Sequence, residues 1–417
     1  MIRRLTALVL ATALVGGCSL DPAYRRPVAP IPAAWPQGGP YAAPTAGALA
    51  GPVDWRTLTA DPKLAALIDT ALAENRNLRA AVANAQIARA QFEAQRSLLF
   101  PTLDATASAN YARTTLLTGG HQNVRTISAG LAVSAYELDL FGRQRSLSRA
   151  AFEQYLATDE GRRAAQLSLI AETSTTYLTL AADRSFADLA LATRRSAEES
   201  LALTQRRFTA GIASQLDVRQ AETVVEQARA DAARYAIAAA QAKNALDLVV
   251  GRTVAEAETP TGLDEVASSF RPIPVGVRSE VLLVRPDVLQ AEHLLRAANA
   301  DIGAARAAFF PSIALTGSAG GASTALSSLF RGANSTWSFT PSVVLPIFAG
   351  GRNLANLRGA RAAKDFAVAQ YEGAIQAAFR DVADALAGRG GFTEQRAAQE
   401  ALVAAAADAL RLSTARY

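Results

Sequence analysis

The chain has 417 residues, of which 50% are hydrophobic but only 6% are aromatic. This composition, rich in small aliphatic side chains, favours long and closely packed helices over a single bulky core. The net charge of +5 is small for such a length and the arginines are scattered, so nucleic-acid binding is not indicated. After the N-terminus, no apolar run reaches the roughly 20 residues of a membrane-spanning helix.

Residues 1–17 have the pattern of a lipoprotein signal peptide. A basic start and a short apolar core at residues 5–15 precede Gly16-Gly17-Cys18. These residues resemble the lipobox of bacterial lipoproteins, in which the signal is cut before the cysteine. The new N-terminus is then acylated, with palmitate among the acyl groups. The alternative, a chance cysteine after an ordinary signal, is weaker because small residues fill both preceding positions.

Cys18 is the only cysteine in the chain, which excludes disulfides and thiol-based metal sites. Ser19 rather than aspartate follows it, and by the same resemblance this indicates sorting to the outer membrane of a Gram-negative cell. Residues 18–53 are then predicted to be a lipid-anchored linker. Prolines recur throughout this stretch and disfavour both helix and sheet. A tether between the lipid and the first domain is a sufficient explanation for it.

After the linker, the chain repeats itself. Phe100-Pro101 aligns with Phe310-Pro311 at a spacing of about 210 residues, and Arg143 aligns with Arg352 at nearly the same spacing. Each repeat is expected to carry a helix, two extended segments and a long helix. The predicted boundaries are a first repeat at 54–250, an equatorial connection at 251–285 and a second repeat at 286–417.

The extended segments, at 102–136 and 312–347, alternate apolar and polar side chains over about ten residues each. This pattern is typical of membrane-spanning strands with one face to lipid and one to a polar lumen, although half-buried strands of a soluble sheet look similar. Thr118-Gly119-Gly120 and Gly320-Gly321-Ala322 are expected to be polar loops of two hairpins. Four strands cannot close a barrel and open edges are not tolerated in hydrocarbon, so several chains must share the barrel. Three copies would supply twelve strands.

Residues 143–250 are predicted to form a long helical hairpin. No proline occurs from Arg143 to Phe208, so at about 1.5 Å per residue the first helix could span roughly 100 Å. The returning helix carries an unbroken heptad seam, which is typical of a left-handed supercoil against a partner helix. The seam positions are Val218, Ala221, Val225, Ala228, Ala232, Tyr235, Ala239, Ala242, Leu246 and Val249.

The lipobox, the proline-rich lead and the duplicated halves resemble the TolC-like outer-membrane factors of tripartite efflux pumps, in particular the efflux lipoproteins of the NodT/RND type. The resemblance covers nearly the whole chain from Cys18 onward. The sequence words that carry it are Asp139-Leu140-Phe141-Gly142-Arg143, Pro274-Val275-Gly276, Leu283-Val284-Arg285-Pro286-Asp287, Gln290-Ala291-Glu292, Ala297-Ala298-Asn299-Ala300-Asp301-Ile302-Gly303, Phe310-Pro311 and Phe348-Ala349-Gly350-Gly351-Arg352.

The resemblance implies a mostly α fold with a small transmembrane β part. In this family the chain is a homotrimer, whose long helical hairpins form an α-barrel through the periplasm beneath a shared 12-stranded β-barrel with four strands per chain. The implied function is a passive duct that exports small molecules such as drugs. The implied partners are outer-membrane lipid, a periplasmic adaptor (membrane fusion protein) and, through it, an inner-membrane transporter.

The sequence departs from the family pattern at its end. Tyr417 occupies the position that matches Phe208, so the long helix at 352–417 has no glycine turn and no returning helix after it. By comparison with the first repeat, about 40 or more further residues are expected in a complete chain. The second repeat is therefore interpreted as truncated before its final helix, which would bear on closure of a trimer.

The turn of the helical hairpin carries the candidate site residues. Gly211 suits the left-handed position after a helix, and Arg207 beside Phe208 suits the negative end of the helix dipole. Ser214 followed by Asp217 predicts an N-cap with an acidic partner. Capping alone accounts for each of these residues. By resemblance, the turn is also the periplasmic tip, where the adaptor binds and the pore is constricted, and Asp217 is expected to favour cations in transit.

No catalytic constellation is evident, and we expect no enzymatic activity, cofactor or metal site. His121, in a polar loop, and His293, on a helix, fall in different segments, and the carboxylates show no ligand-like spacing. One alternative function is a lipid-anchored periplasmic coiled-coil scaffold without a pore, against which the four amphipathic strands argue. Another is a duct for metal efflux or type I protein secretion, which the sequence does not separate from drug efflux.

Overall fold

The structure is a computed structural model, and it describes residues 19–41, 54–115, 119–271 and 279–414. Cys18, the predicted lipidation site, lies outside these ranges, as do the predicted signal peptide, residues 274–276 and Tyr417. The helices are α2 (Trp55–Leu58), α3 (Pro62–Glu74), α4 (Arg76–Ser97), α5 (Arg143–Thr209), α6 (Gln215–Val250), α7 (Leu263–Val266), α8 (Pro286–Ala307) and α9 (Arg352–Thr414). The strands are β1 (Asp104–Thr115), β2 (His121–Glu137), β3 (Ser312–Ser323) and β4 (Ser335–Val344). The short 3₁₀ turns are η1 (Glu256–Glu258), η2 (Ser279–Val284), η3 (Leu326–Ser328) and η4 (Gly332–Asn334).

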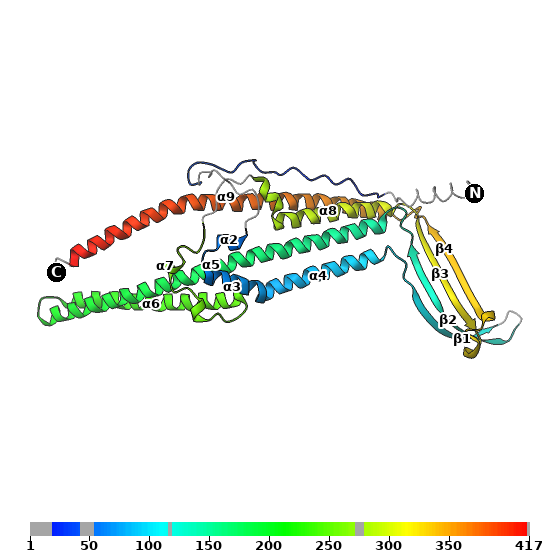
Figure 1. Ribbon diagram of the computed structural model, residues 1–417, viewed down its shortest axis with the longest axis horizontal. Helices are drawn as coiled ribbons and strands as arrows, with labels where there is room; N and C mark the ends of the chain where they lie inside the picture. Colours follow the sequence, from blue (N-terminus) through cyan, green and yellow to red (C-terminus); the bar gives the residue numbers. More distant parts are fainter. Residues whose placement is uncertain (1–18, 42–53, 116–118, 272–278, 415–417) are drawn as a thin grey trace. The chain divides into compact units, whose positions relative to one another are not determined.

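The predicted order of elements occurs twice along the chain (Figure 1). Helices α4 and α8 each have 22 residues, and each is followed by two strands. The long helices α5 and α9, of 67 and 63 residues, then begin at Arg143 and Arg352, the two positions that the repeat aligns. His121, expected in a loop, is the first residue of β2.

The chain divides into two compact units that cut across the sequence repeats. Unit 1 holds residues 19–30, Ala85–Asp159 and Val288–Ile375, and therefore all four strands. Unit 2 holds the described residues of Ile31–Asn84, Glu160–Asp287 and Gln376–Tyr417. The reversal between α5 and α6 belongs to unit 2.

In unit 1, the four strands form one antiparallel sheet in sequential order (Figure 1). Ser108 pairs with Ser128 and Ser318 with Ser338, and in both pairs the hydroxyl oxygens lie 2.8 Å apart. The same interaction therefore recurs in both halves on a polar face. On the opposite face lie the apolar side chains of Leu131, Val133, Ile313, Leu315, Trp337, Phe339 and Val343. The predicted alternation thus gives one polar and one apolar face.

The alternation in β2 was expected to continue through Ala135, and this expectation is wrong. A β-bulge between Val133 and Tyr136 interrupts the pairing with β3, and Ala135 has a φ of 49°. The extra residue moves the following side chains to the other face of the strand. Tyr136 consequently pairs with Leu315, and its hydroxyl donates to the carbonyl of Leu99 at 3.0 Å.

Gly320-Gly321-Ala322, expected as a loop, lies inside β3. Gly320 pairs with Gly130 of β2, and the two backbones are so close that a Cβ at Gly130 would sit 2.5 Å from the carbonyl oxygen of Ala319. These glycines therefore serve the close approach of two strands rather than a turn. The connection to β4 comes later and contains η3 and η4.

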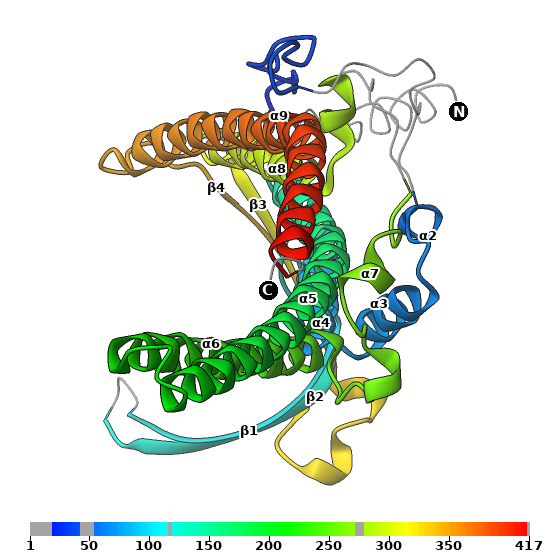
Figure 2. The same ribbon diagram turned by 90° about the vertical axis from the view of Figure 1, so that its left-hand side faces the viewer.

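In unit 2, helix α6 packs along the part of α5 that follows residue 160 (Figure 2). Val225 and Ala228 pack with Ala197, and Leu246 belongs to a core with Tyr177. Every position of the predicted heptad seam is buried or half-buried. The heptad prediction is confirmed, and its small side chains let the two helices lie close together.

Candidate functional site: the helical tip, the strand junction and the N-terminal segment

The tip, residues 207–217, is a tight reversal between α5 and α6. Gly211 has a φ of 75°, and its amide donates to the carbonyl of Phe208 at 2.9 Å. The amide of Ile212 donates to the carbonyl of Arg207 at 2.8 Å. These two bonds form a Schellman motif, which satisfies the last carbonyls of α5 and requires the left-handed backbone that glycine adopts readily. The predicted conformation of Gly211 is confirmed.

Ser214 caps the N-terminus of α6, as predicted. Its hydroxyl accepts a hydrogen bond from the amide of Asp217 at 3.2 Å, and the Asp217 carboxylate accepts from the amide of Ser214 at 2.7 Å and from its hydroxyl at 2.8 Å. This reciprocal arrangement is a capping box. The hydrogen bonds from the amide and hydroxyl of Ser214, and to a smaller extent the charge of Arg207, hold the pKa of Asp217 below its usual range. Asp217 therefore carries its negative charge at neutral pH.

Large apolar side chains at the tip are exposed. Phe208, Ile212 and Leu216 have exposed fractions of 42, 69 and 64%. Arg207 and Asp217 are exposed beside them. Helix capping explains the glycine and the two polar residues but does not require apolar groups in contact with water. Exposed apolar groups flanked by charges are a common feature of protein-binding surfaces.

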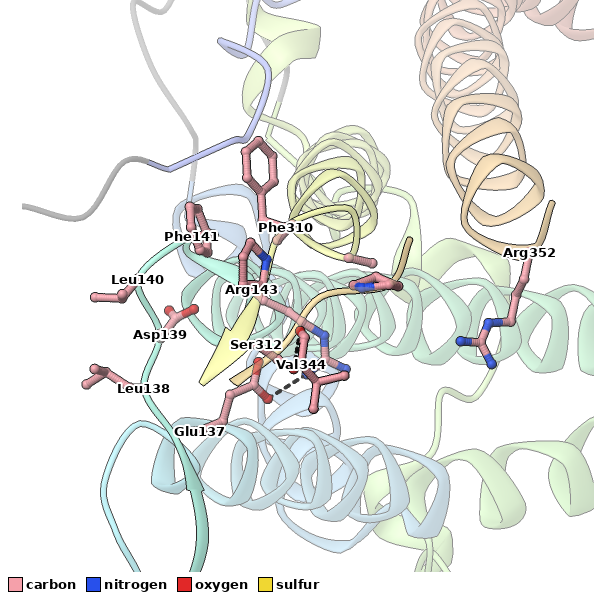
Figure 3. Close-up of a pocket in the computed structure, with 14 residues that line it drawn as sticks. Glu137, Leu138, Asp139, Leu140, Phe141, Arg143, Phe310, Ser312, Val344 and Arg352 are labelled. Atoms are coloured by element: carbon pink, nitrogen blue, oxygen red, sulfur yellow. Dashed lines mark hydrogen bonds and ion pairs between the residues drawn. The ribbon is translucent and has the colours of Figure 1, made fainter. Parts of the chain in front are cut away.

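The junction between the sheet and the long helices lies in unit 1 (Figure 3). Glu137, at the end of β2, pairs with Arg143 at 2.9 Å, and Phe141 stacks on Phe310 with ring centroids 4.7 Å apart. The carboxylate of Asp139 accepts hydrogen bonds from two backbone amides in the first turn of α5, at 3.1 and 3.0 Å. Residues 139–143, one of the motifs that carry the family resemblance, therefore follow the end of β2 and cap the N-terminus of α5.

The segment that follows Cys18 is bound to α8. The carboxylate of Glu292 accepts a hydrogen bond from the Tyr24 hydroxyl at 3.1 Å and from Nε of Arg26 at 3.0 Å, and its second oxygen pairs with the same guanidinium. Arg296 pairs with Glu292 at 2.7 Å, and its guanidinium lies 5.0 Å from the centroid of the Tyr24 ring. The Glu292 side chain is only 2% exposed. We call Tyr24, Arg26, Glu292 and Arg296 the N-terminal clamp.

The charges of the N-terminal clamp fix its protonation states. Burial alone would raise the pKa of Glu292, but Arg26 and Arg296 outweigh burial and hold the pKa of this carboxyl below its usual range. Burial, and next the negative charge of Glu292, raise the pKa of Tyr24 to about 12. Glu292 is therefore an anion and Tyr24 a neutral hydrogen-bond donor at neutral pH.

Two further side chains hold the same segment by its backbone. Asn299 donates to the carbonyl of Pro22 at 2.8 Å, and Arg306 donates to the carbonyl of Leu20 at 2.9 Å. From the sequence, only a tether is predicted here, because the prolines give no periodic pattern and the partners lie more than 200 positions away. The available signal was the family word Gln290-Ala291-Glu292, which places a carboxylate on a mostly apolar helix.

These features define a class of protein. A strand sheet with one apolar and one polar face, joined to helices of 67 and 63 residues, is suited to a membrane channel that extends far outside the bilayer. Comparison with known proteins identifies the family: the model of the outer membrane efflux protein family matches residues 67–252 and 277–417, and the chain belongs to this family.

The probable efflux pump outer membrane protein TtgC of Pseudomonas putida is 45% identical over 423 residues, which cover 100% of this chain and 87% of that protein. Outer membrane protein OprJ of Pseudomonas aeruginosa is 46% identical and is matched over 86% of its length by 99% of this chain. The crystal structure of the open state of the Neisseria gonorrhoeae MtrE outer membrane channel superposes with a TM-score of 0.84 and 39% identity, covering 96% of this chain and 88% of that one.

The chain is therefore an outer-membrane efflux protein with a TolC-like fold, mostly helical with four strands per chain. Because this is a family of channels, the alternative of a scaffold without a pore is set aside. The family is not a family of enzymes. Among the helices that the structure describes, none combines the length and the hydropathy needed to cross a bilayer. Nor do three or more potential metal ligands gather anywhere in the described ranges.

Proposed function

We propose that this chain is one protomer of a trimeric outer-membrane duct, through which a tripartite pump exports small molecules such as drugs. The sheet carries this proposal. Its four strands have a polar face that suits a water-filled lumen and an apolar face that suits lipid. Within the described residues, β1 and β4 each pair on one side only, so three copies would close twelve strands without an open edge.

The tip is the proposed contact with a periplasmic adaptor and, through it, with an inner-membrane transporter. Phe208 and Ile212 are exposed apolar groups, Arg207 is a neighbouring cation, and Gly211 and Ser214 fix the turn that presents them. Asp217 is the proposed anionic group of the gate. Cys18 is the proposed lipidation site that anchors the N-terminus in the inner leaflet of the outer membrane.

The duct is tested with protein extracted from outer membranes in detergent. We expect native mass spectrometry to give the mass of three chains, and planar bilayers to show discrete conductance steps. A monomer without conductance, in protein that retains its helical circular dichroism, would contradict the proposal.

Replacing Asp217 by asparagine is expected to lower the cation-to-anion permeability ratio of the channel about fivefold. The attraction between one unit charge and a permeating ion a few ångströms away in water changes the local concentration of that ion about fivefold. Asparagine keeps an acceptor oxygen for the capping bond from Ser214, so the change isolates the charge from the cap. The measurement is the reversal potential in a salt gradient, together with the block by multivalent cations.

A matched control is Glu226→Gln, which removes a carboxylate from the exposed surface of the same helix, where it pairs with Arg229 at 3.0 Å. This variant is expected to leave the reversal potential within experimental error of the wild type. If the Asp217 variant behaved like this control, the gate role of Asp217 would be excluded.

A further inference from the structure

Beyond the strand residues that adjoin the helices, the strand hairpins carry positive charge and no negative charge. From residue 105 to 136 and from 312 to 351 the sequence has no aspartate or glutamate, whereas Arg113, Arg125 and Arg331 fall within these stretches. A surface in water usually mixes both signs of charge. Their separation here implies that the arginines meet anions from outside the chain.

Arg113 and Arg125 lie at the loop end of the first hairpin. β1 ends two residues after Arg113, and β2 begins four residues before Arg125. The nearest carboxylates, Asp104 and Glu137, occupy the opposite end of the same strands, where the chain joins the helices. The arginines are therefore separated from these carboxylates by almost the full length of the sheet.

Both arginines belong to the apolar face of the sheet. Arg125 is directly opposite Tyr111, and Arg113 lies two positions further along β1, on the same face. The guanidinium carbon of Arg125 lies 5.2 Å from the centroid of the Tyr111 ring. This stacking fixes the guanidinium plane and leaves its N–H groups free for an acceptor. Within the described residues, neither guanidinium has an ion pair or a hydrogen bond from its own chain.

The position of these residues indicates the ligand. If the apolar face contacts lipid, as in the proposed duct on which this inference rests, the loop end reaches the outer leaflet. Tyr111 and Arg125 then lie level with each other at the boundary of the hydrocarbon, and Arg113 lies two positions beyond them. The outer leaflet of a Gram-negative outer membrane consists of phosphorylated glycolipid. We propose that Tyr111, Arg113 and Arg125 form a binding site for a phosphate group of this glycolipid. Arginine suits this role because its N–H groups can contact two phosphate oxygens at once.

The test uses protein in nanodiscs of phosphatidylethanolamine, titrated with bisphosphorylated lipid A and followed by native mass spectrometry. We expect lipid A to bind about 30-fold more weakly to the double variant R113Q/R125Q, since each arginine near a membrane surface contributes about fivefold to affinity for anionic lipid. The variant R113K/R125K, which keeps the charge but loses the planar stacking, is expected to show an intermediate affinity. Circular dichroism on each variant establishes that the helices are folded, and conductance in a planar bilayer establishes that the sheet is.

Two comparisons make the result specific. Arg331→Gln removes the same charge from the loop between β3 and β4 and is expected to change lipid A affinity less than twofold. Each lipid is also tested for its ability to displace bound bisphosphorylated lipid A. Lipid A without phosphates is expected to displace little of it, and phosphatidylglycerol is expected to displace less of it than added bisphosphorylated lipid A does. Equal losses in Arg331→Gln and in the double variant, or equal competition by the three lipids, would overturn the proposal in favour of unspecific attraction.

The outcome also separates this site from the proposed duct. Conductance of the wild-type preparation reports on the duct, and lipid selectivity reports on the arginines. Conducting protein without a preference for phosphorylated glycolipid would refute only the lipid site. Protein that neither conducts nor forms trimers would refute the duct, and with it the orientation on which the lipid site depends.

Discussion

Gly130→Ala is expected to prevent the two strand hairpins from forming one stable sheet. Gly130 and Gly320 face each other across the pairing of β2 with β3, which is the only connection between the two hairpins within the described sheet. A methyl group at Gly130 would lie 2.5 Å from the carbonyl oxygen of Ala319 and 2.8 Å from Cα of Gly320. Both obstacles are backbone atoms, so no side chain can rotate away. We expect the free energy of unfolding to fall by about 3 kcal/mol, the upper part of the range for overpacking.

The measurement follows urea unfolding in detergent by tryptophan fluorescence. With Trp35 and Trp55 replaced by phenylalanine, Trp337 on β4 is the only tryptophan and reports on the sheet. The matched control is Gly317→Ala on β3, where the added methyl would meet its nearest atoms at 3.6 and 3.8 Å, an ordinary contact distance. The control is expected to change stability by less than about 0.5 kcal/mol. Equal stability of the two alanine variants would show that the close approach of β2 and β3 is not required.

The helical part of the fold was predictable because its signals are local and repeated. The heptad seam of α6 extends over the whole helix, and each position that it marked is buried or half-buried. The tip was predictable for a different reason. Gly211, Ser214 and Asp217 are capping residues whose partners lie within four positions, so the bonds that they make follow from spacing alone.

The strands were predictable as strands but not in their detail. A period of two places side chains on alternate faces, and this holds for β1, β3 and β4. It fails at Ala135, because a bulge depends on how β2 is paired with β3 and not on the residues of β2 alone. Gly320 and Gly321 were assigned to a loop because glycine usually marks one. Glycine is required at these positions because the backbone of another segment lies within contact distance. This close approach can be seen only once the register of the strands is known.

The N-terminal clamp could not be predicted from local patterns. Arg26 and Glu292 are 266 positions apart, and a proline-rich segment gives no periodic signal that would show what it binds. The functional assignment of the tip residues is likewise not contained in their geometry. The capping bonds explain why Ser214 and Asp217 are polar, while the family supplies the prediction that this turn meets an adaptor.

Glu292→Gln is expected to release the segment next to the lipid anchor. The carboxylate is nearly fully buried, and it compensates Arg26 and Arg296, whose side chains are 43% and 38% exposed. In the variant, the neutral amide of glutamine would no longer compensate the charges of Arg26 and Arg296, which would then repel each other. Breaking a buried ion pair from one side costs about 3 kcal/mol, so we expect opening of the segment to become about 100-fold more frequent.

Trypsin measures this opening, because it cleaves after Arg25 but not after Arg26, which precedes Pro27. The rate of cleavage after Arg25 follows the population of the open segment when closing is fast. Glu222→Gln is the matched control, since it removes a half-buried carboxylate that pairs with the exposed Arg219 at 2.7 Å on α6. We expect cleavage after Arg25 to accelerate about 100-fold in Glu292→Gln and less than twofold in the control. Similar cleavage rates in both variants would mean that the clamp does not hold the segment.

The same clamp is expected to open in acid, with a direction that follows from the pKa of Glu292. The folded protein holds this pKa below the ordinary value of 4.5. The clamp therefore contributes its full stability above pH 4.5 and loses it as the pH falls through the lower, folded pKa. A nitroxide attached to cysteine at the exposed position of Ala23 should be immobile at neutral pH and become mobile below pH 4.5 in the wild type. In Glu292→Gln it should be mobile throughout, because no carboxylate remains to titrate. A wild-type label whose mobility did not change down to pH 3, or one that became mobile between pH 6 and 7, would assign the attachment of the segment to groups other than Glu292.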